Sequence, residues 1–324
     1  MIKTLLVLFP LSGEKKAELA SALPETEILY RAPDLYTPEE LNRADVIFGN
    51  IKPSELAGAG SLKWLHLASA GTDGYLDAAR GGIMLTNGTG AYDVVLPEHM
   101  LALLFAVNMR MGAYHDSQKA HVWKRLGWSD YIYGKTCVML GAGSIGCGFL
   151  RRMKALGAYT IGVRRSGTSK PDYVDEMHGM ADIDALLPRA DIVAMALPGT
   201  PETVNIIDGR RIALMKPGAK LINCGRGSAV DAEALAAALR SGQLSGAGID
   251  VAYKEPLPED SFLWDVPNLV ITPHIAGAWE MTASSPFMEE TVYSVFADNV
   301  SDYLAGRPLR NLVDLSTGYR KTQK

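Results

Sequence analysis

The sequence Val138-Met139-Leu140-Gly141-Ala142-Gly143-Ser144-Ile145-Gly146 decides the fold of this chain. The apolar run at 136–140 predicts a buried strand. A helix is predicted after it, because apolar residues recur at helical spacing at Ile145, Phe149, Met153 and Leu156. Between the two, Gly141 allows a tight turn, Gly143 lets the backbone approach a pyrophosphate, and Gly146 lets the helix pack on the strand. Strand, glycine turn and helix in this order predict a dinucleotide-binding site, with Ser144 and Ile145 at the helix N-terminus that faces the phosphates.

A second predicted strand, at 159–163, indicates which dinucleotide binds. Arg164, Arg165 and Ser166 follow it. Arg164 is 23 residues after Gly141, and the first acidic residue after this group is Asp172. A site for NAD would place an acid here to bind the ribose 2′-hydroxyl, whereas guanidinium groups suit a 2′-phosphate. The alternative is that the arginines are a solvated strand end. The sequence favours NADP(H) and leaves NAD(H) open as the alternative cofactor.

Length and composition limit the class of protein. A chain of 324 residues with 48% hydrophobic and 21% charged residues predicts a soluble protein of two domains. The net charge of −4 gives no reason to expect nucleic acid or an anionic membrane as a partner. Cys137, Cys147 and Cys224 lack CxxC spacing, so we expect them to be packing residues and not metal ligands. We also expect the protein to be located in a reducing compartment, the cytoplasm. The run at 2–9 predicts a first strand, not a signal peptide, and no apolar run is long enough to cross a bilayer.

Strands and helices alternate on both sides of the glycine turn, which predicts parallel sheets. A bridging helix is expected at 97–111, a second helix at 114–123, and six or seven strands between 136 and 274. The last helix, expected at 285–304, would return the chain to the first domain. One side of this helix is expected to carry Phe287, Thr291, Ser294, Val295 and Val300.

One loop of the first domain fits a small anion. Ser69-Ala70-Gly71-Thr72-Asp73 is a turn of small residues that enters a helix after a predicted strand. Its free N–H groups would bind a carboxylate, in which case Ala70 and Gly71 are the substrate-binding residues. An ordinary strand-to-helix turn is an equally good interpretation of the spacing.

Three strand ends after the glycine turn carry reactive side chains. Arg226 lies between glycines, Glu255 follows a strand at 246–251, and His274 follows a strand at 269–273. Reduction of a bound 2-oxo acid needs a cation for the carboxylate, a proton donor for the carbonyl oxygen and an acid that orients that donor. Each residue alone is usually a surface charge or a structural histidine. Together, Arg226, Glu255 and His274 predict a catalytic group.

With these residues in place, the sequence resembles the D-isomer-specific 2-hydroxyacid dehydrogenases over nearly its whole length. The matching segments are 69–73, 90–99, 141–146, 197–203, 223–231, 250–258, 264–268, 272–277 and 311–314. The resemblance implies that Arg226 binds the substrate carboxylate and carbonyl, that His274 is the acid and base, and that Glu255 pairs with His274. It also implies that the backbone of Ala70 and Gly71 helps to hold the carboxylate.

The same resemblance implies an architecture and further cofactor contacts. Asp250 would contact the nicotinamide carboxamide, and Leu197-Pro198 would line the adenine pocket. The implied α/β fold has two doubly wound parallel-sheet domains: a flavodoxin-like substrate domain at 1–96 and 285–324, and a Rossmann cofactor domain at 97–284. A homodimer formed through the cofactor domain is also implied.

The chain departs from the family pattern at a few positions. Arg164-Arg165 replaces an acid common in members that prefer NAD, which is similar to the NADPH-linked glyoxylate/hydroxypyruvate reductase branch. Pro97 stands where Ala is usual, and Asp93 stands where many members have Thr. No added C-terminal regulatory domain is expected, so the serine-pathway members that carry one are a poorer match.

Other functions stay open at this point. Family relatives act as nucleotide-sensing corepressors with much of the same catalytic group, and others oxidise formate or phosphonate. An NAD-preferring D-2-hydroxyacid dehydrogenase is a third alternative. The preferred 2-oxo acid is not predicted, because the candidate pocket residues could equally belong to the core; they are Ile51, Tyr92, Trp128, Trp279 and Met281.

Overall fold

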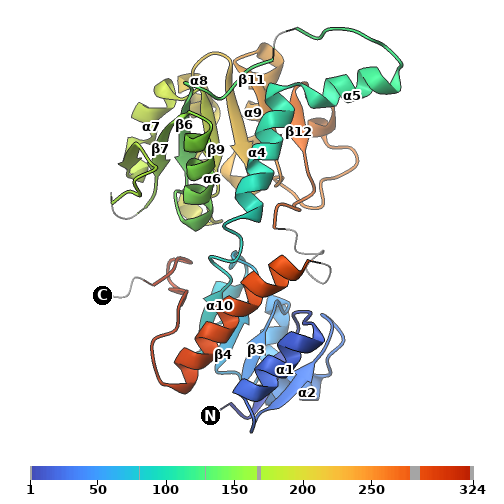
Figure 1. Ribbon diagram of the computed structural model, residues 1–324, viewed down its shortest axis with the longest axis vertical. Helices are drawn as coiled ribbons and strands as arrows, with labels where there is room; N and C mark the ends of the chain where they lie inside the picture. The colour runs from blue at the N-terminus through green and yellow to red at the C-terminus, as the bar shows by residue number, and fades with distance from the viewer. Residues whose placement is uncertain (1, 80, 128, 166–168, 278–284, 322–324) are drawn as a thin grey trace. The chain divides into compact units, whose positions relative to one another are not determined.

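The computed structural model describes residues 2–321 except positions 80, 128, 166–168 and 278–284. The chain forms two compact units (Figure 1). Unit 1 comprises residues 1–92 and 278–324, and unit 2 comprises residues 93–277. Each is an α/β unit built on one parallel sheet, which confirms the expected fold class.

Unit 1 contains a five-stranded parallel sheet in the order β2-β1-β3-β4-β5, which is the flavodoxin-like order. The strands are β1 (Thr4–Val7), β2 (Glu27–Tyr30), β3 (Val46–Phe48), β4 (Trp64–Leu67) and β5 (Met84–Asn87). The helices are α1 (Gly13–Ala22), α2 (Pro38–Arg43), α3 (Tyr75–Ala78) and α10 (Pro286–Leu304), with a short 3-10 helix at Pro53–Gly58. The start of α2 is fixed locally, because Thr37 and Glu40 cap it reciprocally and Pro38 occupies its first turn.

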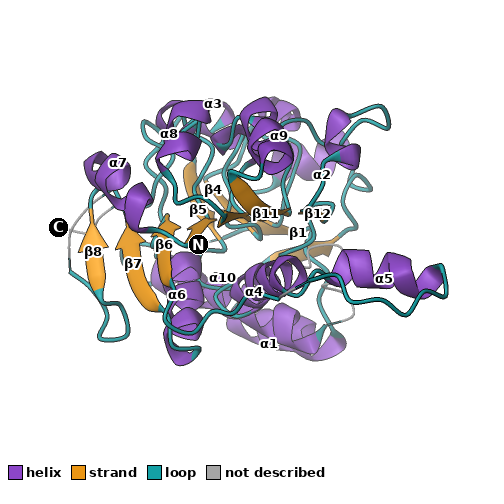
Figure 2. Cartoon of the chain, turned by 90° about the horizontal axis from the view of Figure 1, so that it is seen from above, coloured by secondary structure: helices purple, strands orange, loops and turns teal. Residues whose placement is uncertain are grey.

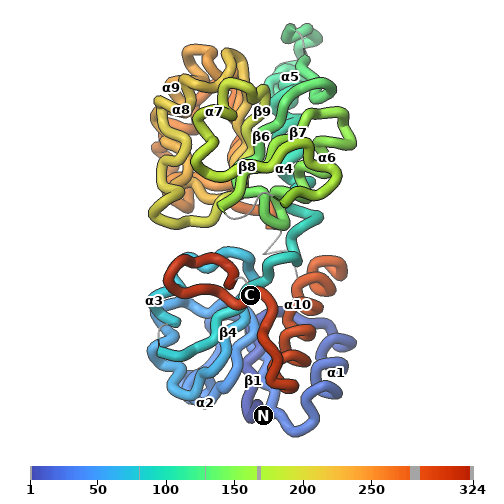
Figure 3. The backbone as a smooth tube through the Cα atoms, turned by 90° about the vertical axis from the view of Figure 1, so that its left-hand side faces the viewer, coloured from blue at the N-terminus to red at the C-terminus, as the bar shows by residue number. Residues whose placement is uncertain are grey.

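Helix α10 packs on the unit 1 sheet through aromatic rings. Phe296 stacks on Phe48 with ring centroids 4.0 Å apart. Of the residues expected along one side of this helix, Val300 is buried and Phe287 is exposed; the buried residues of α10 are Met288, Val292, Tyr293, Phe296, Asn299 and Val300. After α10, the C-terminal segment runs along unit 1 (Figure 3) and bridges β5 between Leu312 and Thr86.

Unit 2 contains a seven-stranded parallel sheet in the order β12-β11-β10-β9-β6-β7-β8. This is the dinucleotide-binding order with one strand added at an edge. The strands are β6 (Thr136–Leu140), β7 (Tyr159–Val163), β8 (Glu176–His178), β9 (Ile192–Met195), β10 (Ala219–Asn223), β11 (Leu244–Ile249) and β12 (Leu269–Ile271). Neighbours β6 and β9 lie where the strand order reverses, so the loops after them share the crevice in which such sheets bind ligands.

Helices cover both faces of the unit 2 sheet (Figure 2): α4 and α6 lie on one face, and α7, α8 and α9 on the other. Their bounds are α4 (Val95–Asn108), α5 (Met111–Lys119), α6 (Ser144–Ala155), α7 (Ile183–Leu186), α8 (Gly209–Leu214) and α9 (Ala232–Ser241). Short 3-10 helices occur at Met180–Asp182, Leu187–Arg189, Pro201–Thr203, Gly227–Ala229 and Phe262–Asp265. Helix α9 begins after its N-cap Asp231, whose side chain accepts from the Ala234 N–H, and Gly242 in a left-handed conformation is its C-cap.

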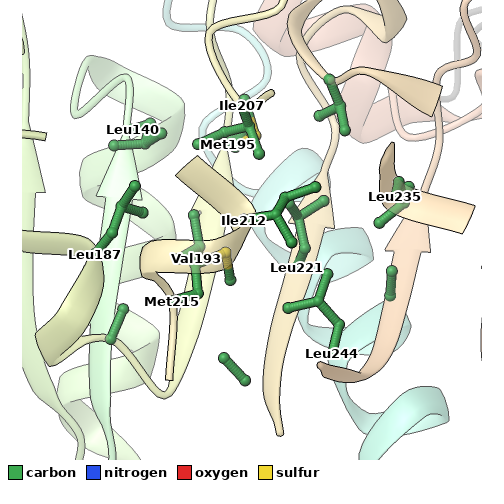
Figure 4. Close-up of a cluster of buried hydrophobic side chains, with 14 of the residues drawn as sticks. Leu140, Leu187, Val193, Met195, Ile207, Ile212, Met215, Leu221, Leu235 and Leu244 are labelled. Carbon is green, nitrogen blue, oxygen red and sulfur yellow. The ribbon is translucent and has the colours of Figure 1, made fainter. Parts of the chain in front are cut away.

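A large apolar cluster joins the unit 2 sheet to α8 and α9. Figure 4 shows its central side chains, which include Val193 and Leu221 from the sheet and Ile212 and Leu235 from the helices. Cys137 and Cys224 are buried core residues as expected, whereas Cys147 is only half-buried. Burial of this apolar surface provides most of the driving force that holds the site-bearing strands in register.

Two elements of unit 2 differ from expectation. Strand β8 was not predicted, because its three residues show no clear alternation of apolar and polar side chains. Among the described residues it is defined as a strand by its hydrogen-bonded pairing with β7. The helix expected at 114–123 lies at 111–119 instead. Arg110 and His121 adopt left-handed backbone conformations on either side of it, so Trp123 falls outside the helix and is fully exposed.

Candidate active site

The turn between β6 and α6 has the geometry of a phosphate-binding loop. Gly141 has φ +92°, and a Cβ there would lie 2.6 Å from the Ala196 carbonyl oxygen. A Cβ at Gly146 would lie 2.2 Å from the Gly141 carbonyl oxygen, so both positions require glycine for packing. At Gly143, by contrast, a Cβ would meet no described atom within 4 Å. The protein itself leaves open the position where the backbone would approach a pyrophosphate.

Helix α6 offers its N-terminal N–H groups to this open space. Its cap residue is Gly143, which has no side chain to satisfy them, and Ser144 and Ile145 form the first turn. Ile145 is half-buried against the core of the unit, which fixes the turn. Uncapped helix N-termini bind anions, so the glycine turn fits the pyrophosphate of a dinucleotide.

The two arginines after β7 interact with α6 and with the loop after β9. The Arg164 backbone N–H donates to the His178 carbonyl at 3.1 Å, its guanidinium donates to the Ser169 carbonyl, and its charge acts on Cys147 in α6. The pKa of Glu202 is lowered by hydrogen bonds from its own N–H and from Thr200, and further by the charge of Arg165. Ser166, the third expected residue of this group, lies outside the described residues.

The loop after β9 packs against the glycine turn, where a Cβ at Gly141 would lie 3.2 Å from Leu197 Cδ2. Leu197 is buried and Pro198 is half-buried. The Thr203 hydroxyl donates to the Pro198 carbonyl at 2.7 Å, which folds 198–203 into a compact turn. The loop thus brings Leu197 and Pro198 close to the glycine turn, while their contact with an adenine stays a prediction.

Arg226 is held by a tightly packed loop at the end of β10. A Cβ at Gly225 would lie 2.6 Å from the Leu197 nitrogen, and one at Gly227 would lie 1.9 Å from the Ala252 carbonyl oxygen. The Asn223 side chain stabilises the loop through two hydrogen bonds: it accepts from the Gly225 N–H at 3.0 Å and donates to the Arg226 carbonyl at 2.9 Å. The Arg226 guanidinium itself donates to the Gly225 carbonyl at 2.8 Å.

His274 and Glu255 are in direct contact. The imidazole Nδ1 lies 2.6 Å from Glu255 Oε2, and the two side chains are 48% and 37% exposed. The other carboxylate oxygen accepts the Ala252 N–H at 2.9 Å, so the acid is fixed from both sides. With Nδ1 donating to the acid, Nε2 is the nitrogen that can exchange a proton with a ligand. Because β10, β11 and β12 are neighbours, Arg226, Glu255 and His274 all follow strand ends at one edge of the sheet.

Asp250 organises the loop that carries His274. It is 1% exposed, and its carboxylate accepts from the Thr272 hydroxyl at 2.6 Å and from the N–H groups of Ile275 and Ala276 at 2.9 Å each. Burial opposes its charge, but hydrogen bonds from His99, Thr272 and the loop backbone outweigh burial and lower the pKa of Asp250. Its observed contacts therefore position the loop, while contact with a nicotinamide stays a prediction.

The small-residue loop of unit 1 is fixed by asparagines. Asn50 Nδ2 donates to the Ser69 hydroxyl at 2.9 Å, and Asn87 Nδ2 donates to the Ala70 carbonyl at 2.7 Å. The Ser69 hydroxyl donates to the Gly71 carbonyl at 2.9 Å. The N–H groups of Ala70 and Gly71 donate to no acceptor among the described residues, so the loop has the donors that a carboxylate needs.

Several residues that hold the candidate active site in place were not predicted from the sequence. No role was predicted for Asn50, Asn87, His99 and Thr272, because each acts through a partner in another segment of the chain, although His99 and Thr272 lie inside the matching segments 90–99 and 272–277. Ile51 and Tyr92, considered as pocket residues, are buried in the core of unit 1. Trp128, Trp279 and Met281 lie outside the described residues.

Two negative observations concern only the part of the chain that the structure describes. No group of three or more His, Cys, Asp or Glu side chains there could hold a metal ion. Within the same residues, no helix has the length and apolarity needed to span a membrane.

Fold and site together define a two-unit α/β protein whose larger unit is built to bind a dinucleotide. Residues 101–276 match the family model described as "D-isomer specific 2-hydroxyacid dehydrogenase, NAD binding domain". This match covers more than half of the chain. The chain belongs to the D-isomer-specific 2-hydroxyacid dehydrogenase family, which confirms the resemblance seen in the sequence.

Relatives within the family carry different names. A glyoxylate/hydroxypyruvate reductase B from Pectobacterium carotovorum is 34% identical over 82% of this chain and 83% of its own length. A D-3-phosphoglycerate dehydrogenase from Mycobacterium leprae is 32% identical over 94% of this chain but only 54% of its own length. The chain thus spans about half the length of the phosphoglycerate dehydrogenases it matches, and over that shared part the similarity is comparable to that with the reductase.

A solved structure has the same fold throughout. An NADPH-dependent glyoxylate/hydroxypyruvate reductase from Sinorhizobium meliloti, in complex with NADP and sulfate, is 26% identical and superposes with a TM-score of 0.80. The match covers 98% of this chain and the whole of that one.

Proposed function

We propose that this protein is an NADP(H)-preferring oxidoreductase that reduces a small 2-oxo acid to the D-2-hydroxy acid. The observation that carries the proposal is the His274–Glu255 pair at 2.6 Å, which follows strands neighbouring that of Arg226 at the edge of the sheet that bears the open glycine turn. Glyoxylate, hydroxypyruvate and longer 2-oxo acids are the substrate candidates. Unit 2 would bind the cofactor and supply Arg226 and His274, and unit 1 would be the substrate domain of the family.

The residues suggest how each part of the reaction is served. A bound nicotinamide supplies the hydride that reaches C2 of the 2-oxo acid. His274 Nε2 gives its proton to the carbonyl oxygen as that oxygen gains negative charge, while Glu255 holds the ring through Nδ1. The Arg226 guanidinium binds the carboxylate and stabilises the developing charge, and the N–H groups of Ala70 and Gly71 add donors to the carboxylate.

Steady turnover over a panel of 2-oxo acids, measured as NADPH oxidation and repeated with NADH, tests this proposal first. His274→Asn should lower kcat by about 10²–10⁴-fold, because the proton donor is lost, while NADPH binding stays unchanged. Near-normal turnover of this variant would remove His274 from the role. The panel also measures the size of the substrate pocket.

NADP preference rests on Arg164 and Arg165, which follow the strand next to the glycine turn. Replacing both by Ser should weaken NADPH binding by about 10–100-fold and spare NADH, because only NADPH carries the 2′-phosphate. Arg210→Ser, which removes an exposed arginine paired with Asp184, is the matched control. Equal weakening of both cofactors would refute the assignment and favour an NAD-type enzyme.

Each competing function would give a different result in these assays. Tight nucleotide binding without turnover on any 2-oxo acid would identify a sensing or corepressor-like protein. Reduction of NADP⁺ or NAD⁺ with formate or phosphonate as donor would identify the other dehydrogenase class. The direct contact between His274 and Glu255 favours the 2-oxo acid reaction, since only that reaction needs a proton donor for a carbonyl oxygen.

We further propose a cytoplasmic homodimer. The three cysteines are free, in keeping with a reducing compartment. None of the residues of α5 is buried, and Trp123 beyond it is fully exposed, so this part of unit 2 has the surface that a second copy would cover. Sedimentation of the wild type and of Trp123→Glu tests the dimer, and a monomeric wild type would refute it.

A further inference from the structure

The loop that carries His274 is exposed and depends on hydrogen bonds for its position. Pro273, His274 and Ile275 are exposed, and Ala276 is the next buried residue. His274 has φ +56°, a left-handed conformation that costs energy for a residue other than glycine. The Asp250 carbonyl accepts the His274 N–H at 2.7 Å, and its carboxylate accepts the next two N–H groups. The place of the imidazole therefore follows from the place of Asp250.

Asp250 and Thr272 are neighbours because their strands are in register. Ile249 at the end of β11 pairs with Ile271 at the end of β12, and Asp250 and Thr272 are the next residues of the two strands. The Thr272 hydroxyl donates to Asp250 Oδ1 at 2.6 Å. A hydroxyl has one hydrogen, so the Thr272 oxygen can take part in a further hydrogen bond only as an acceptor.

His99 of α4 supplies that further hydrogen bond. Its Nε2 lies 2.9 Å from the Thr272 hydroxyl oxygen and 3.4 Å from Asp250 Oδ1. Because the Thr272 hydrogen is already donated to the carboxylate, the hydrogen between His99 and Thr272 belongs to Nε2. Burial opposes the charge of Asp250, and the hydrogen bonds from His99 and Thr272 help to outweigh burial and lower the pKa of this acid.

Two glycines of β11 fix the helix that carries His99. A Cβ at Gly248 would lie 2.8 Å from Leu103 Cβ, and one at Gly246 would lie 2.4 Å from Val107 Cγ1. The lack of side chains at both positions lets α4 pack directly on the strand. His99 is four residues before Leu103, so the two side chains share a face of the helix. The close packing of α4 thus fixes His99 relative to the end of β11.

We propose that His99 is a positioning residue that acts on His274 through Thr272 and Asp250. The Nε2–H of His99 directs the Thr272 hydrogen to the carboxylate, and the carboxylate is held where it accepts the loop N–H groups. The inference rests on the proposed function, since the fixed loop serves the transfer of a proton by His274 to the 2-oxo acid.

Two amides at position 99 separate hydrogen-bond donation from packing. His99→Gln places an amide N–H close to the place of Nε2, whereas the side chain of His99→Asn is one methylene shorter and stops short of the Thr272 hydroxyl. With NADPH and a 2-oxo acid, we expect kcat near the wild-type value for His99→Gln. For His99→Asn we expect kcat to fall by about 10–100-fold, because misplacement of a reacting group by about 1 Å has an effect of this size. Equal kcat values for the two variants would overturn the inference.

Hydrogen exchange of the loop amides gives a result that does not depend on turnover. In NMR measurements on the full chain without dinucleotide, the Ile275 and Ala276 N–H groups should exchange about 10–100-fold faster in His99→Asn than in wild type or His99→Gln. Loss of a hydrogen bond to a charged group weakens a local structure by about that factor. The Ala234 N–H, which donates to the Asp231 carboxylate at 3.0 Å, is the internal control and should not change. Unchanged exchange at Ile275 and Ala276 would contradict the proposed role.

Thr272→Val completes a double-mutant cycle with His99→Asn. Valine keeps the shape of threonine and removes the hydroxyl through which His99 is proposed to act. The double variant should therefore lose no more kcat than the weaker of the two single variants, whereas fully multiplied losses would show that His99 acts by another route. Absence of turnover in the wild type would overturn the proposed function, and the exchange rates would then decide separately whether His99 holds the loop.

Discussion

Gly227 sets the position of Arg226 through a single close contact. The Cβ of Gly227→Ala would lie 1.9 Å from the Ala252 carbonyl oxygen, and backbone cannot yield as a flexible side chain would. We expect the 225–227 loop to shift, lowering kcat/KM for the 2-oxo acid by about 10²-fold, because misplacement of a substrate-binding group by about 1 Å has that effect. NADPH affinity, measured by fluorescence titration, should stay near the wild-type value.

Gly112→Ala is the control for this variant. A Cβ at Gly112, in α5, would meet nothing within 4 Å, and alanine favours a helix by about 1 kcal/mol. Turnover should not change. If Gly227→Ala also kept full turnover, the loop would be more tolerant than its packing indicates.

At the level of single residues, the residues that take part in the reaction could be predicted from the sequence better than the residues that hold them in place by hydrogen bonds. The choice of Arg226, Glu255 and His274 followed from what a 2-oxo acid needs, and the structure brings the last two into contact. The donors to Asp250 could not be predicted, because His99 and Thr272 reach it from other segments of the chain. The same holds for Asn87, which lies 17 residues from the carbonyl it fixes.

At the scale of the β6–α6 element, two glycines have separable roles. Gly146→Ala would force a Cβ to 2.2 Å from the Gly141 carbonyl oxygen, so we expect a loss of stability of about 1–3 kcal/mol. Gly143→Ala has free space and an ordinary backbone conformation, so its stability should stay within about 1 kcal/mol of wild type. The added methyl should nevertheless weaken dinucleotide binding, because it occupies the space through which the phosphates approach.

Thermal unfolding and NADPH titration of both variants separate these effects. A Gly143→Ala variant that binds NADPH as well as wild type would contradict the assignment of the open space to the cofactor. Loss of stability in Gly143→Ala would instead mean that the turn is packed more tightly than the structure shows.

Elements with strong periodicity were predictable, and elements that depend on partners were not. The alternation of strands and helices identified both parallel sheets, which the strand orders confirm. Strand β8 has three residues and exists through its pairing with β7. The shift of α5 arises from left-handed conformations at Arg110 and His121, which are unusual for residues that are not glycine. The buried side of α10 follows from aromatic stacking on Phe48 and not from the pattern of its own sequence.

At the scale of the whole molecule, the division into two units implies more than one unfolding transition. Each unit has its own sheet and core, so acid should affect them differently. Unit 1 contains a feature without a counterpart among the described residues of unit 2: a fully buried histidine, His66 in β4.

His66 should make unit 1 sensitive to mild acid. Its Nδ1 lies 2.7 Å from the Thr86 hydroxyl, Nε2 has no partner among the described residues, and Phe48 and Phe296 flank the ring. Burial lowers the pKa of His66 to about 3, against 6.5 as its ordinary value. The contribution of this neutral ring to the free energy of unfolding is fully present above about pH 6.5 and is lost as pH falls toward 3. The loss amounts to up to about 1.4 kcal/mol per pH unit, because in this range only the unfolded chain binds the proton.

Unfolding of wild type and of His66→Gln between about pH 7.5 and pH 5 measures this effect. The amide cannot titrate, so the difference between the free energies of unfolding of the two proteins should shrink as pH falls, whatever the absolute loss from the substitution. His115→Gln, at an exposed site on α5, controls for loss of a histidine and should follow the wild-type curve. If the curves of wild type and His66→Gln stay parallel, His66 accepts its proton in the folded state and unit 1 opens to water at that ring.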